Sequence, residues 1–246
     1  MNRHSPAAPA AETARAGKEG VPYTLVIPAY NEERRISSLL EQLPGAGGEF
    51  IVVCEGTDLT AQLVTEFAAD HPGVRIRCES RRERMGKGGA IRAGLVLARS
   101  PLVGYMDADG STSLSQMLLL FSQLDGADAV IGSRWTEGSV LLEPQGFTRR
   151  LQSRAFNIFT RLLFDLPFKD TQCGAKVFKK AAVDAVISEM VSTGFEFDVE
   201  LLWRLQSRDF RIREHPISWQ NRGESRVRAG DIVRMLLGLA RVRFIR

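Results

Sequence analysis

Short apolar runs alternate with segments of helical periodicity from Thr24 onward, and this alternation constrains the fold more than any other feature of the chain. In the first such segment Ile36, Leu39, Leu40 and Leu43 follow i, i+3, i+4, i+7 spacing, which provides one apolar face to pack on a sheet. The pattern predicts an α/β fold, in which a mostly parallel sheet is covered by helices. The expected strands are Thr24–Pro28, Phe50–Val53, Val74–Arg77, Leu102–Met106 and Ala129–Gly132.

Length and patterning favour one folded domain, preceded by an N-terminal tail and followed by a C-terminal helix. The 246 residues, of which 44% are hydrophobic and 25% charged, can bury one substantial core. Residues 1–20 are rich in Ala, Pro and Gly without apolar periodicity and are expected to form a disordered tail. Residues 21–230 contain neither an internal repeat nor a linker and are expected to form a single domain, with two halves that meet near residue 135. Residues 231–246 are predicted to begin as a basic amphipathic helix, with Ile232, Met235, Leu236 and Leu239 on its apolar side.

The chain lacks the signals of export and of membrane insertion. No run reaches the roughly 18 apolar residues that cross a bilayer, and no apolar segment follows the N-terminus as in a secretory signal. A cytoplasmic location is therefore expected. The three cysteines, Cys54, Cys78 and Cys173, have neither CxxC nor Cys/His spacing, which favours reduced thiols over a disulfide framework or a zinc site.

The net charge of +4 is compatible with nucleotides, phosphates, nucleic acid or acidic lipid as partners. A basic nucleic-acid or membrane-binding module without catalysis would fit this charge. The aromatic residues, however, do not interleave with the basic ones as single-strand binding requires, so no nucleic acid is expected.

Two carboxylates follow directly on an expected strand in Tyr105-Met-Asp-Ala-Asp-Gly-Ser111. Side chains at i and i+2 of an extended segment point the same way, so Asp107 and Asp109 can address one cation. Mg²⁺ or Mn²⁺ held there would neutralise a nucleotide diphosphate. A turn that only ends the strand is the simpler alternative. Ligands of open α/β sheets bind beyond the carboxyl ends of the strands, and this position favours the metal site.

Two further strand ends carry groups that suit a nucleotide. After the first strand, Ile27-Pro-Ala-Tyr-Asn-Glu-Glu33 offers Tyr30 for stacking and Glu32 for hydrogen bonding, although a strand-to-helix turn with Asn31 as N-cap explains the same residues. The glycine-rich Arg84-Met-Gly-Lys-Gly-Gly-Ala90 opens a helix, so its backbone can approach a ligand closely and Lys87 can offer charge to a phosphate.

In their order along the chain, these motifs and Gly132-Ser-Arg-Trp135 resemble the GT-A glycosyltransferases of family 2. The later segments Asp170-Thr-Gln-Cys-Gly-Ala-Lys-Val-Phe178 and Gly194-Phe-Glu-Phe-Asp-Val-Glu-Leu201 resemble the branch that glucosylates or mannosylates dolichyl and polyprenyl phosphate. The resemblance implies a doubly wound, mostly parallel sheet with helices on both faces, a donor half up to about residue 135 and an acceptor half after it. It also implies inverting transfer of a hexose, from UDP-glucose or next from GDP-mannose, to a polyprenyl or dolichyl phosphate.

The same resemblance assigns roles on the donor side. It implies that Pro28, Tyr30 and Glu32 frame the nucleobase and ribose, and that Asp107 and Asp109 hold the metal. Two positions depart from the family pattern. Ser111 stands where the mannosyl branch has a Gln, and Val53-Cys-Glu-Gly-Thr-Asp58 replaces the usual D-D-G-S-x-D, leaving Glu55 and Asp58 as the nucleotide contacts of that loop.

A phosphate acceptor makes its own demand on the site. Its second pKa is about 6, so the nucleophile is already ionised and needs a cationic grip more than a strong base. The resemblance places the arginine of Gly132-Ser-Arg and a late Ser-Arg pair near this phosphate, and Asp198 beside the sugar as a base or orienting group. Acids at a helix N-terminus also suit the helix dipole, which is the structural alternative for Asp198. The expected acceptor contacts are Arg134, Arg149 or Arg150, Ser225 and Arg226.

Other readings of the chain stay open at this point. Transfer to a small soluble hydroxyl acceptor would require Asp198 as a true base, because an alcohol is not ionised at neutral pH. A sugar nucleotidyltransferase would be expected to carry a G-G-x-G-x-R loop after the first strand, whereas this chain has Pro-Ala-Tyr-Asn-Glu-Glu there, which disfavours that class. The basic C-terminal helix fits an enzyme that reaches a lipid phosphate as a peripheral protein on the inner face of the membrane, and a helix packed on the domain explains it equally.

Overall fold

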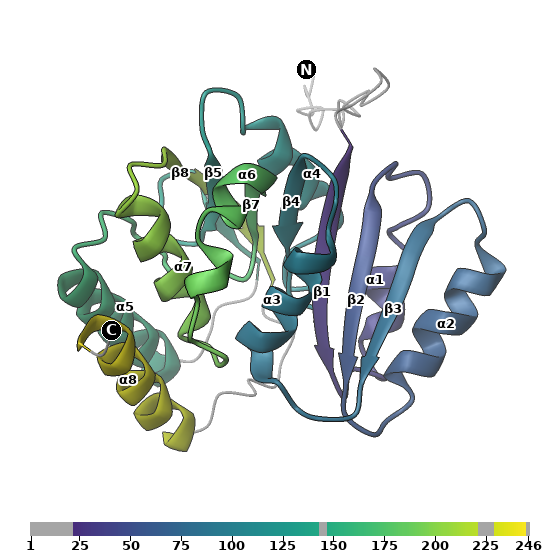
Figure 1. Cartoon of the computed structure of the whole chain (residues 1–246), viewed down its shortest axis with the longest axis horizontal. Coiled ribbons are helices and arrows are strands. Elements are labelled where there is room, and N and C mark those ends of the chain that lie inside the picture. Colours follow the sequence, from purple (N-terminus) through teal and green to yellow (C-terminus); the bar gives the residue numbers. More distant parts are fainter. Residues whose placement is uncertain (1–21, 143–146, 221–228, 245–246) are drawn as a thin grey trace, which may run out of the picture.

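The computed structural model describes residues 22–142, 147–220 and 229–244. Its main sheet has seven strands in the order β3-β2-β1-β4-β7-β5-β8, flanked by helices (Figure 1). Neighbouring strands are parallel except for β7, which runs antiparallel to both β4 and β5. The strands are β1 Tyr23–Tyr30, β2 Glu49–Glu55, β3 Arg75–Arg81, β4 Leu102–Tyr105, β5 Ala129–Ser133, β7 Lys176–Lys179 and β8 Ile212–Pro216.

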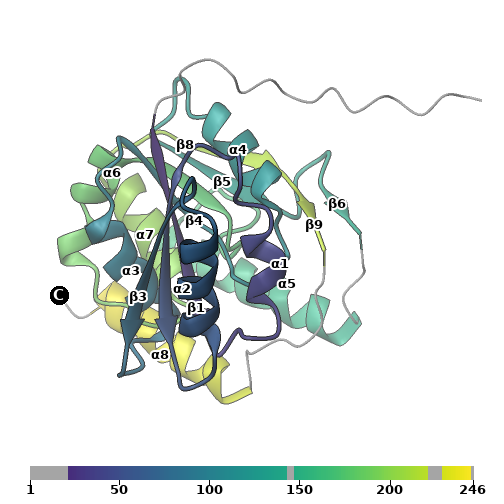
Figure 2. The same ribbon diagram turned by 90° about the vertical axis from the view of Figure 1, so that its right-hand side faces the viewer.

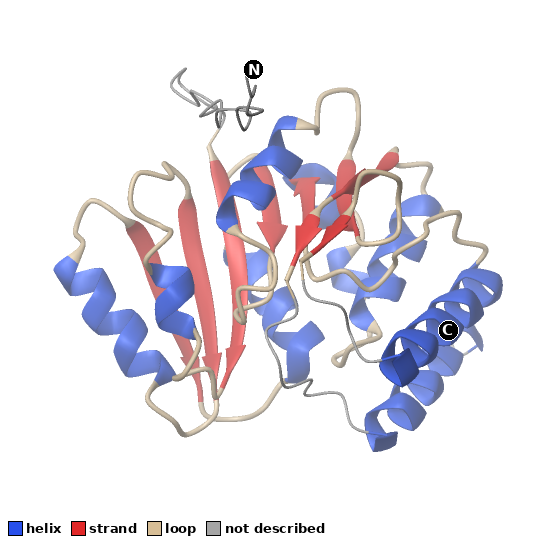
Figure 3. Ribbon diagram, turned by 180° about the vertical axis from the view of Figure 1, so that it is seen from behind, coloured by secondary structure: helices blue, strands red, loops and turns tan. Residues whose placement is uncertain are grey.

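The helices cover both faces of this sheet, as Figures 1 and 3 show from opposite sides. A small second sheet pairs β6 (Val140–Leu141) with β9 (Ser218–Trp219) and stands apart from the main one (Figure 2). The helices are α1 Ile36–Leu40, α2 Thr60–Asp70, α3 Gly86–Leu97, α4 Leu114–Ser122, α5 Phe147–Phe164, α6 Lys180–Asp184, the 3₁₀ helix η1 Ile187–Glu189, α7 Phe197–Gln206 and α8 Ala229–Phe244.

The central strands are largely apolar because each buries both of its faces. Along β1, Leu25 and Ile27 belong to one core cluster and Val26 belongs to the other, on the opposite face of the sheet. This follows from the two-residue period of a strand. Helix α3 lies close on Val26 because Gly94 has no side chain; a Cβ at that position would stand 2.3 Å from a Val26 methyl carbon. The expected α/β architecture and its mostly parallel sheet are confirmed.

The C-terminal helix α8 packs on the domain through Met235, Leu239 and Val242, which are buried. Leu236, expected on the apolar side, is 37% exposed, so that part of the predicted pattern is wrong. The helix also turns Val242 inward, a residue that was not predicted on the apolar side. In the part of the chain that the structure describes, no helix is both long and apolar enough to span a membrane.

Candidate active site

Side chains of several elements converge at one edge of the sheet, where the parallel strands have their carboxyl ends. Asp107 follows β4, Glu55 ends β2 and Arg134 follows β5. The antiparallel strand β7 begins at this edge, and its first residue, Lys176, is paired in register with Tyr105. The strand reversal therefore adds a lysine to the two acids and the arginine at the ends of the parallel strands.

Asp107 forms an ion pair with Lys87, whose Nζ lies 2.7 Å from Asp107 Oδ1. Burial alone would raise the pKa of Asp107, but the Lys87 ammonium outweighs it and holds this pKa below its usual value. Burial likewise opposes the charge of Lys87, yet Asp107 and Asp198 together raise the pKa of Lys87 above its usual range. Both groups are therefore charged at neutral pH.

Gly174 brings the loop before β7 against the Asp107 carboxylate. A Cβ at Gly174 would stand 1.9 Å from Asp107 Oδ2, a distance that no side chain can occupy. The Asp170–Phe178 segment therefore needs a glycine at this position for the close approach of its backbone.

Asp198 is the buried centre of the site, at the N-terminal end of α7. Its Oδ1 accepts hydrogen bonds from the Tyr105 hydroxyl and from Lys176 Nζ, both at 2.5 Å, and its Oδ2 lies 3.9 Å from Lys87 Nζ. Lys176 is fully buried and also donates to the carbonyl of Cys173 at 2.5 Å. Burial, and then Asp198, raises the pKa of Tyr105 well above its usual value, so this hydroxyl remains a donor. We call Lys87, Tyr105, Asp107, Lys176 and Asp198 the Asp198 region.

The glycines of the Gly86–Gly89 turn hold the segment that leads to Asp198. A Cβ at Gly86 would stand 2.5 Å from the carbonyl oxygen of Thr193, and one at Gly88 would stand 2.5 Å from Phe197 Cβ. The backbone N–H of Gly89 donates to Thr193 O at 3.1 Å. These glycines, expected to allow a ligand to approach, serve within the protein to seat the start of α7 beside Lys87.

The residues expected to bind the nucleotide lie at the ends of β1 and β2, where several have partners within the protein. Glu32 is buried and pairs with Arg35 at 2.7 Å. Glu55 Oε1 accepts the backbone N–H of Met85 at 2.7 Å, and burial raises its pKa. The guanidinium of Arg84 lies 4.1 Å from the centre of the Tyr30 ring.

The loop after β2 is tied to the loop after β1. Asp58 accepts the backbone N–H groups of Glu33 and Thr60 at 3.0 and 3.1 Å. Asn31, at φ 51°, accepts the N–H of Thr57 at 3.0 Å and is not the N-cap of α1, whose N-cap position is Arg35. Pro28 lies within β1, paired with Val53.

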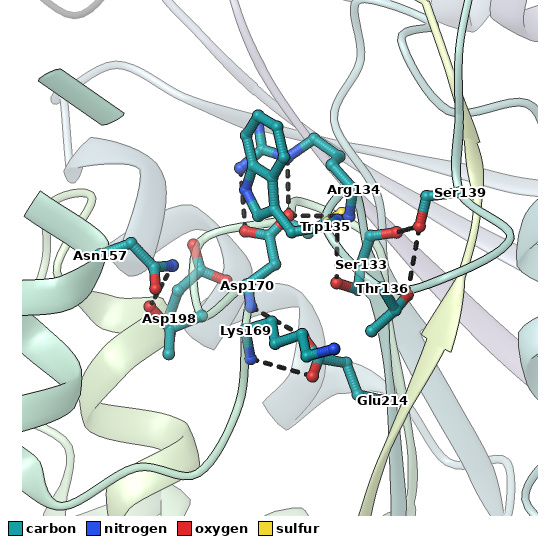
Figure 4. A network of polar contacts seen from close by, with 12 residues as sticks. Ser133, Arg134, Trp135, Thr136, Ser139, Asn157, Lys169, Asp170, Asp198 and Glu214 are labelled. Atoms are coloured by element: carbon teal, nitrogen blue, oxygen red, sulfur yellow. Dashed lines mark hydrogen bonds and ion pairs between the residues drawn. The ribbon is translucent and has the colours of Figure 1, made fainter. Parts of the chain in front are cut away.

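Arg134, expected to contact the acceptor phosphate, forms a bidentate contact with Asp170 within the protein. Its Nε and one Nη donate to the two oxygens of Asp170 at 2.7 and 2.9 Å, and its backbone N–H donates to Asp170 Oδ2 at 3.0 Å (Figure 4). Asp170 has no exposed surface. This burial would raise the pKa of Asp170, but the Arg134 guanidinium holds that pKa below its usual value. The backbone N–H groups of Lys169 and Asp170 donate to Glu214 at 2.9 and 2.7 Å. We call Arg134, Asp170 and Glu214 the Asp170 region.

Part of the expected acceptor site falls outside the described structure. Ser225 and Arg226 belong to residues 221–228, which the structure does not describe. Arg149 and Arg150 lie in the first turns of α5, but their side chains are likewise outside the described part.

Asp107 and Asp109 are the residues that could hold a divalent metal. Asp109 Oδ1 accepts the backbone N–H of Ser111 at 2.9 Å, which orders the turn. Among the described residues no group of three or more His, Cys, Asp or Glu side chains could hold a metal ion. Two carboxylates alone fit Mg²⁺ or Mn²⁺ when phosphate oxygens and water complete the coordination, which is the usual form of a substrate-bridging site.

Lys176 and Tyr105 belong to the site but were not among the residues predicted for it. The available signal was one lysine in the otherwise apolar run Ala175-Lys-Val-Phe178, because a charged residue inside a buried strand needs a partner. Its partner, Asp198, is distant in sequence and could not be paired with it without the fold.

Comparison with known proteins identifies the family. The model of "Glycosyl transferase family 2" matches residues 24–187. The chain is 33% identical to glycosyltransferase AglD of Haloferax volcanii, over 97% of this chain but only 38% of that protein. It is 30% identical to dolichyl-phosphate beta-glucosyltransferase ALG5C of Trichomonas vaginalis, over 89% of this chain and 70% of that protein. These relatives match the branch that the later motifs indicated.

Solved structures share the fold. Glucosyl-3-phosphoglycerate synthase from Mycobacterium tuberculosis superposes with a TM-score of 0.65 at 19% identity, over 96% of this chain and 83% of that one. The mannosyltransferase PcManGT from Pyrobaculum calidifontis has a TM-score of 0.62 at 20% identity, over 89% of this chain and 62% of that one. The expected GT-A fold is confirmed.

Proposed function

The chain belongs to glycosyl transferase family 2, and we propose that it transfers a hexose from a nucleotide sugar to a polyprenyl or dolichyl phosphate, with inversion at the anomeric carbon. The relatives named as dolichyl-phosphate beta-glucosyltransferases support this acceptor and favour UDP-glucose as donor, with GDP-mannose next. The chain spans 38% of the length of AglD, so the acceptor and the donor are both part of the proposal.

The observation that carries the proposal is the setting of Asp198 between two lysines. Its Oδ1 accepts two short hydrogen bonds, and its Oδ2 lies 3.9 Å from the Lys87 ammonium. A carboxylate held in this way is suited to orient groups rather than to remove a proton. A phosphate acceptor is already ionised and is served by nearby cations, whereas an alcohol needs a base. The alternative, a small hydroxyl acceptor, is therefore less well supported.

On the donor side, Asp107 and Asp109 would hold Mg²⁺ or Mn²⁺, which supplies charge neutralisation for the departing diphosphate. Lys87, which pairs with Asp107, would add a second cation beside the diphosphate. Tyr30 and Pro28 would border the base, while Glu32, Glu55 and Asp58 would shape the nucleotide pocket through the backbone that they hold. Arg134 and Arg150, with Ser225 and Arg226, would meet the acceptor phosphate. The expected location, cytoplasmic and peripheral on the inner face of the membrane, is also a proposal.

The direct test is nucleotide release by the purified protein with Mg²⁺ or Mn²⁺, offering UDP-glucose or GDP-mannose with and without a short-chain polyprenyl phosphate. We expect release that depends on the lipid phosphate and is lost in Asp109→Ala. Release that ignores the lipid phosphate, together with glycosylation of a soluble alcohol, would reject the acceptor.

The role of Asp198 has its own test. Asp198→Asn, in protein shown to be folded, should retain measurable transfer to the phosphate acceptor while nearly abolishing any transfer to an alcohol. Complete loss with the phosphate acceptor would contradict the orienting role.

A further inference from the structure

Helices α5 and α8 carry an excess of positive over negative charge that exceeds the net charge of the whole chain. Their sequences contain seven arginines and one aspartate, a net charge of +6, while the whole chain has +4. The rest of the protein therefore has a net charge of −2. The positive charge is concentrated on two helices that lie side by side at one end of the molecule (Figures 1 and 3).

Both helices bury one side in a shared cluster. This cluster includes Phe164 of α5 and Leu239 and Val242 of α8, and the Arg243 side chain donates to the Leu163 carbonyl at 3.4 Å. The opposite sides of the two helices therefore face away from the domain.

Large apolar side chains occupy those outward sides. On α5, Ile158, Phe159 and Leu162 are 54%, 45% and 78% exposed, and their spacing places them opposite the buried Asn157 and Thr160. On α8, Leu237 and Phe244 are 67% and 72% exposed, and their separation of two helical turns puts them on one line. Arg234 and Arg241 beside this line are also exposed. We call Ile158, Phe159, Leu162, Leu237 and Phe244 the α5–α8 surface.

We propose that the α5–α8 surface docks on an anionic phospholipid bilayer, with its apolar side chains among the acyl chains near the headgroups and its arginines at the lipid phosphates. Exposed apolar residues flanked by arginines on a helix are the arrangement that binds such an interface. A purely apolar protein partner would not account for the concentration of positive charge.

The docked surface adjoins the reaction site. Helix α8 meets the start of α7 so closely that a Cβ at Gly238 would stand 3.0 Å from the Glu196 side chain, and Asp198 is two residues further along. A bilayer on this surface would present a lipid-borne phosphate close to the N-terminal end of α7, where Asp198 lies. In this respect the inference rests on the proposed function, while binding to the bilayer does not require it.

Flotation with vesicles of phosphatidylcholine alone, and of equal parts phosphatidylcholine and phosphatidylglycerol, tests the proposal on the full chain. We expect flotation with the anionic vesicles, weakened by salt, and much less with phosphatidylcholine alone. The double variant Leu237→Glu/Phe244→Glu should bind the anionic vesicles at least about tenfold more weakly.

A control matched in charge is Leu59→Glu/Val96→Glu, which changes apolar residues of 56% and 59% exposure outside the α5–α8 surface and should float nearly like the unmodified protein. Absence of flotation by the unmodified protein, or equal flotation by the Leu237/Phe244 variant, would overturn the proposal. So would a concentration-dependent dimer in solution that this variant abolishes, because the surface would then bind a second copy.

A separate assay keeps this inference distinct from the proposed function. With a short-chain polyprenyl phosphate in solution and no vesicles, Leu237→Glu/Phe244→Glu should release nucleotide at the unmodified rate. If the unmodified protein floats but shows no transfer to any lipid phosphate, the proposed function fails and the docking surface stands.

Discussion

The Asp198 region and the Asp170 region each contain a buried carboxylate paired with a cation, but they differ in the geometry of the pair. Asp170 receives the planar fork of Arg134 on both oxygens and the Arg134 backbone N–H as well. Asp198 instead receives one ammonium and one hydroxyl on a single oxygen. A bidentate fork fixes two groups relative to each other, whereas an ammonium is a point charge without directional demand.

This difference in geometry suits the Arg134–Asp170 pair to a structural role and the Asp198 carboxylate to a role in the reaction. The Arg134–Asp170 pair joins the end of β5 to the loop before β7, and Glu214 holds the backbone on the other side of Asp170. The second oxygen of Asp198 faces Lys87, which also contacts Asp107. We therefore expect substitutions in the Asp170 region to act mainly on stability and those in the Asp198 region mainly on activity.

The largest effect is expected for Arg134→Met. It leaves the Asp170 charge buried without its cation, which should lower the free energy of unfolding by about 3–5 kcal/mol in urea denaturation. Arg134→Lys, which retains charge but not the fork, should lose less. Unchanged stability, with only a higher KM for the lipid phosphate, would reverse the comparison, because Arg134 would then serve the acceptor alone and not the fold.

Lys176→Met is expected to act on catalysis. Without Lys176 the Asp198 carboxylate can shift from its position. Because Asp198 is proposed to orient the reacting groups, we expect this shift to lower kcat by about 100-fold and to change KM for the nucleotide sugar little. Steady-state transfer kinetics measure this, and Lys176→Arg should restore part of kcat. A stability loss as large as that of Arg134→Met, with kcat preserved in the folded fraction, would show that both pairs serve the same structural purpose.

Tyr105→Phe removes the second donor to Asp198 and nothing else. A hydrogen bond to a charged group contributes at least about 1.5 kcal/mol, and at this lower value we expect a fall in kcat of about tenfold. Because Lys176 still holds Asp198, the effect should be smaller than that of Lys176→Met. An effect equal to that of Lys176→Met would indicate that the hydroxyl has a further role in the reaction.

The smallest effect concerns pH. The pKa of Asp170 is depressed in the folded protein, so its contribution to stability is complete above the unfolded value of about 4 and is lost as pH falls through the lower, folded value. The free energy of unfolding should therefore show no dependence on this pair between about pH 5 and pH 8. Below about pH 4 it should fall more steeply in the unmodified protein than in Arg134→Met.

Some parts of the site follow from local sequence and others do not. Asp107 and Asp109 were predictable because their position follows from the strand before them, and Lys87 because its turn is rich in glycine. Arg134 was predicted to lie at the site, but not to pair with Asp170, because a sequence does not rank a phosphate against a carboxylate as partner for the same guanidinium. Whether Ser225 and Arg226 reach the acceptor stays a prediction.

The sequence by itself determined the α/β class, the central strands and the carboxylates at their ends, because strand and helix periodicities are local and parallel strands bring their carboxyl ends to one edge. Only the tertiary structure decided that β7 is reversed, which sets Lys176 beside Tyr105 and Asp198. It also decided that the glycines of the Gly86–Gly89 turn pack against the segment that leads into α7. These pairings depend on the order and direction of strands distant in sequence, which no local pattern encodes.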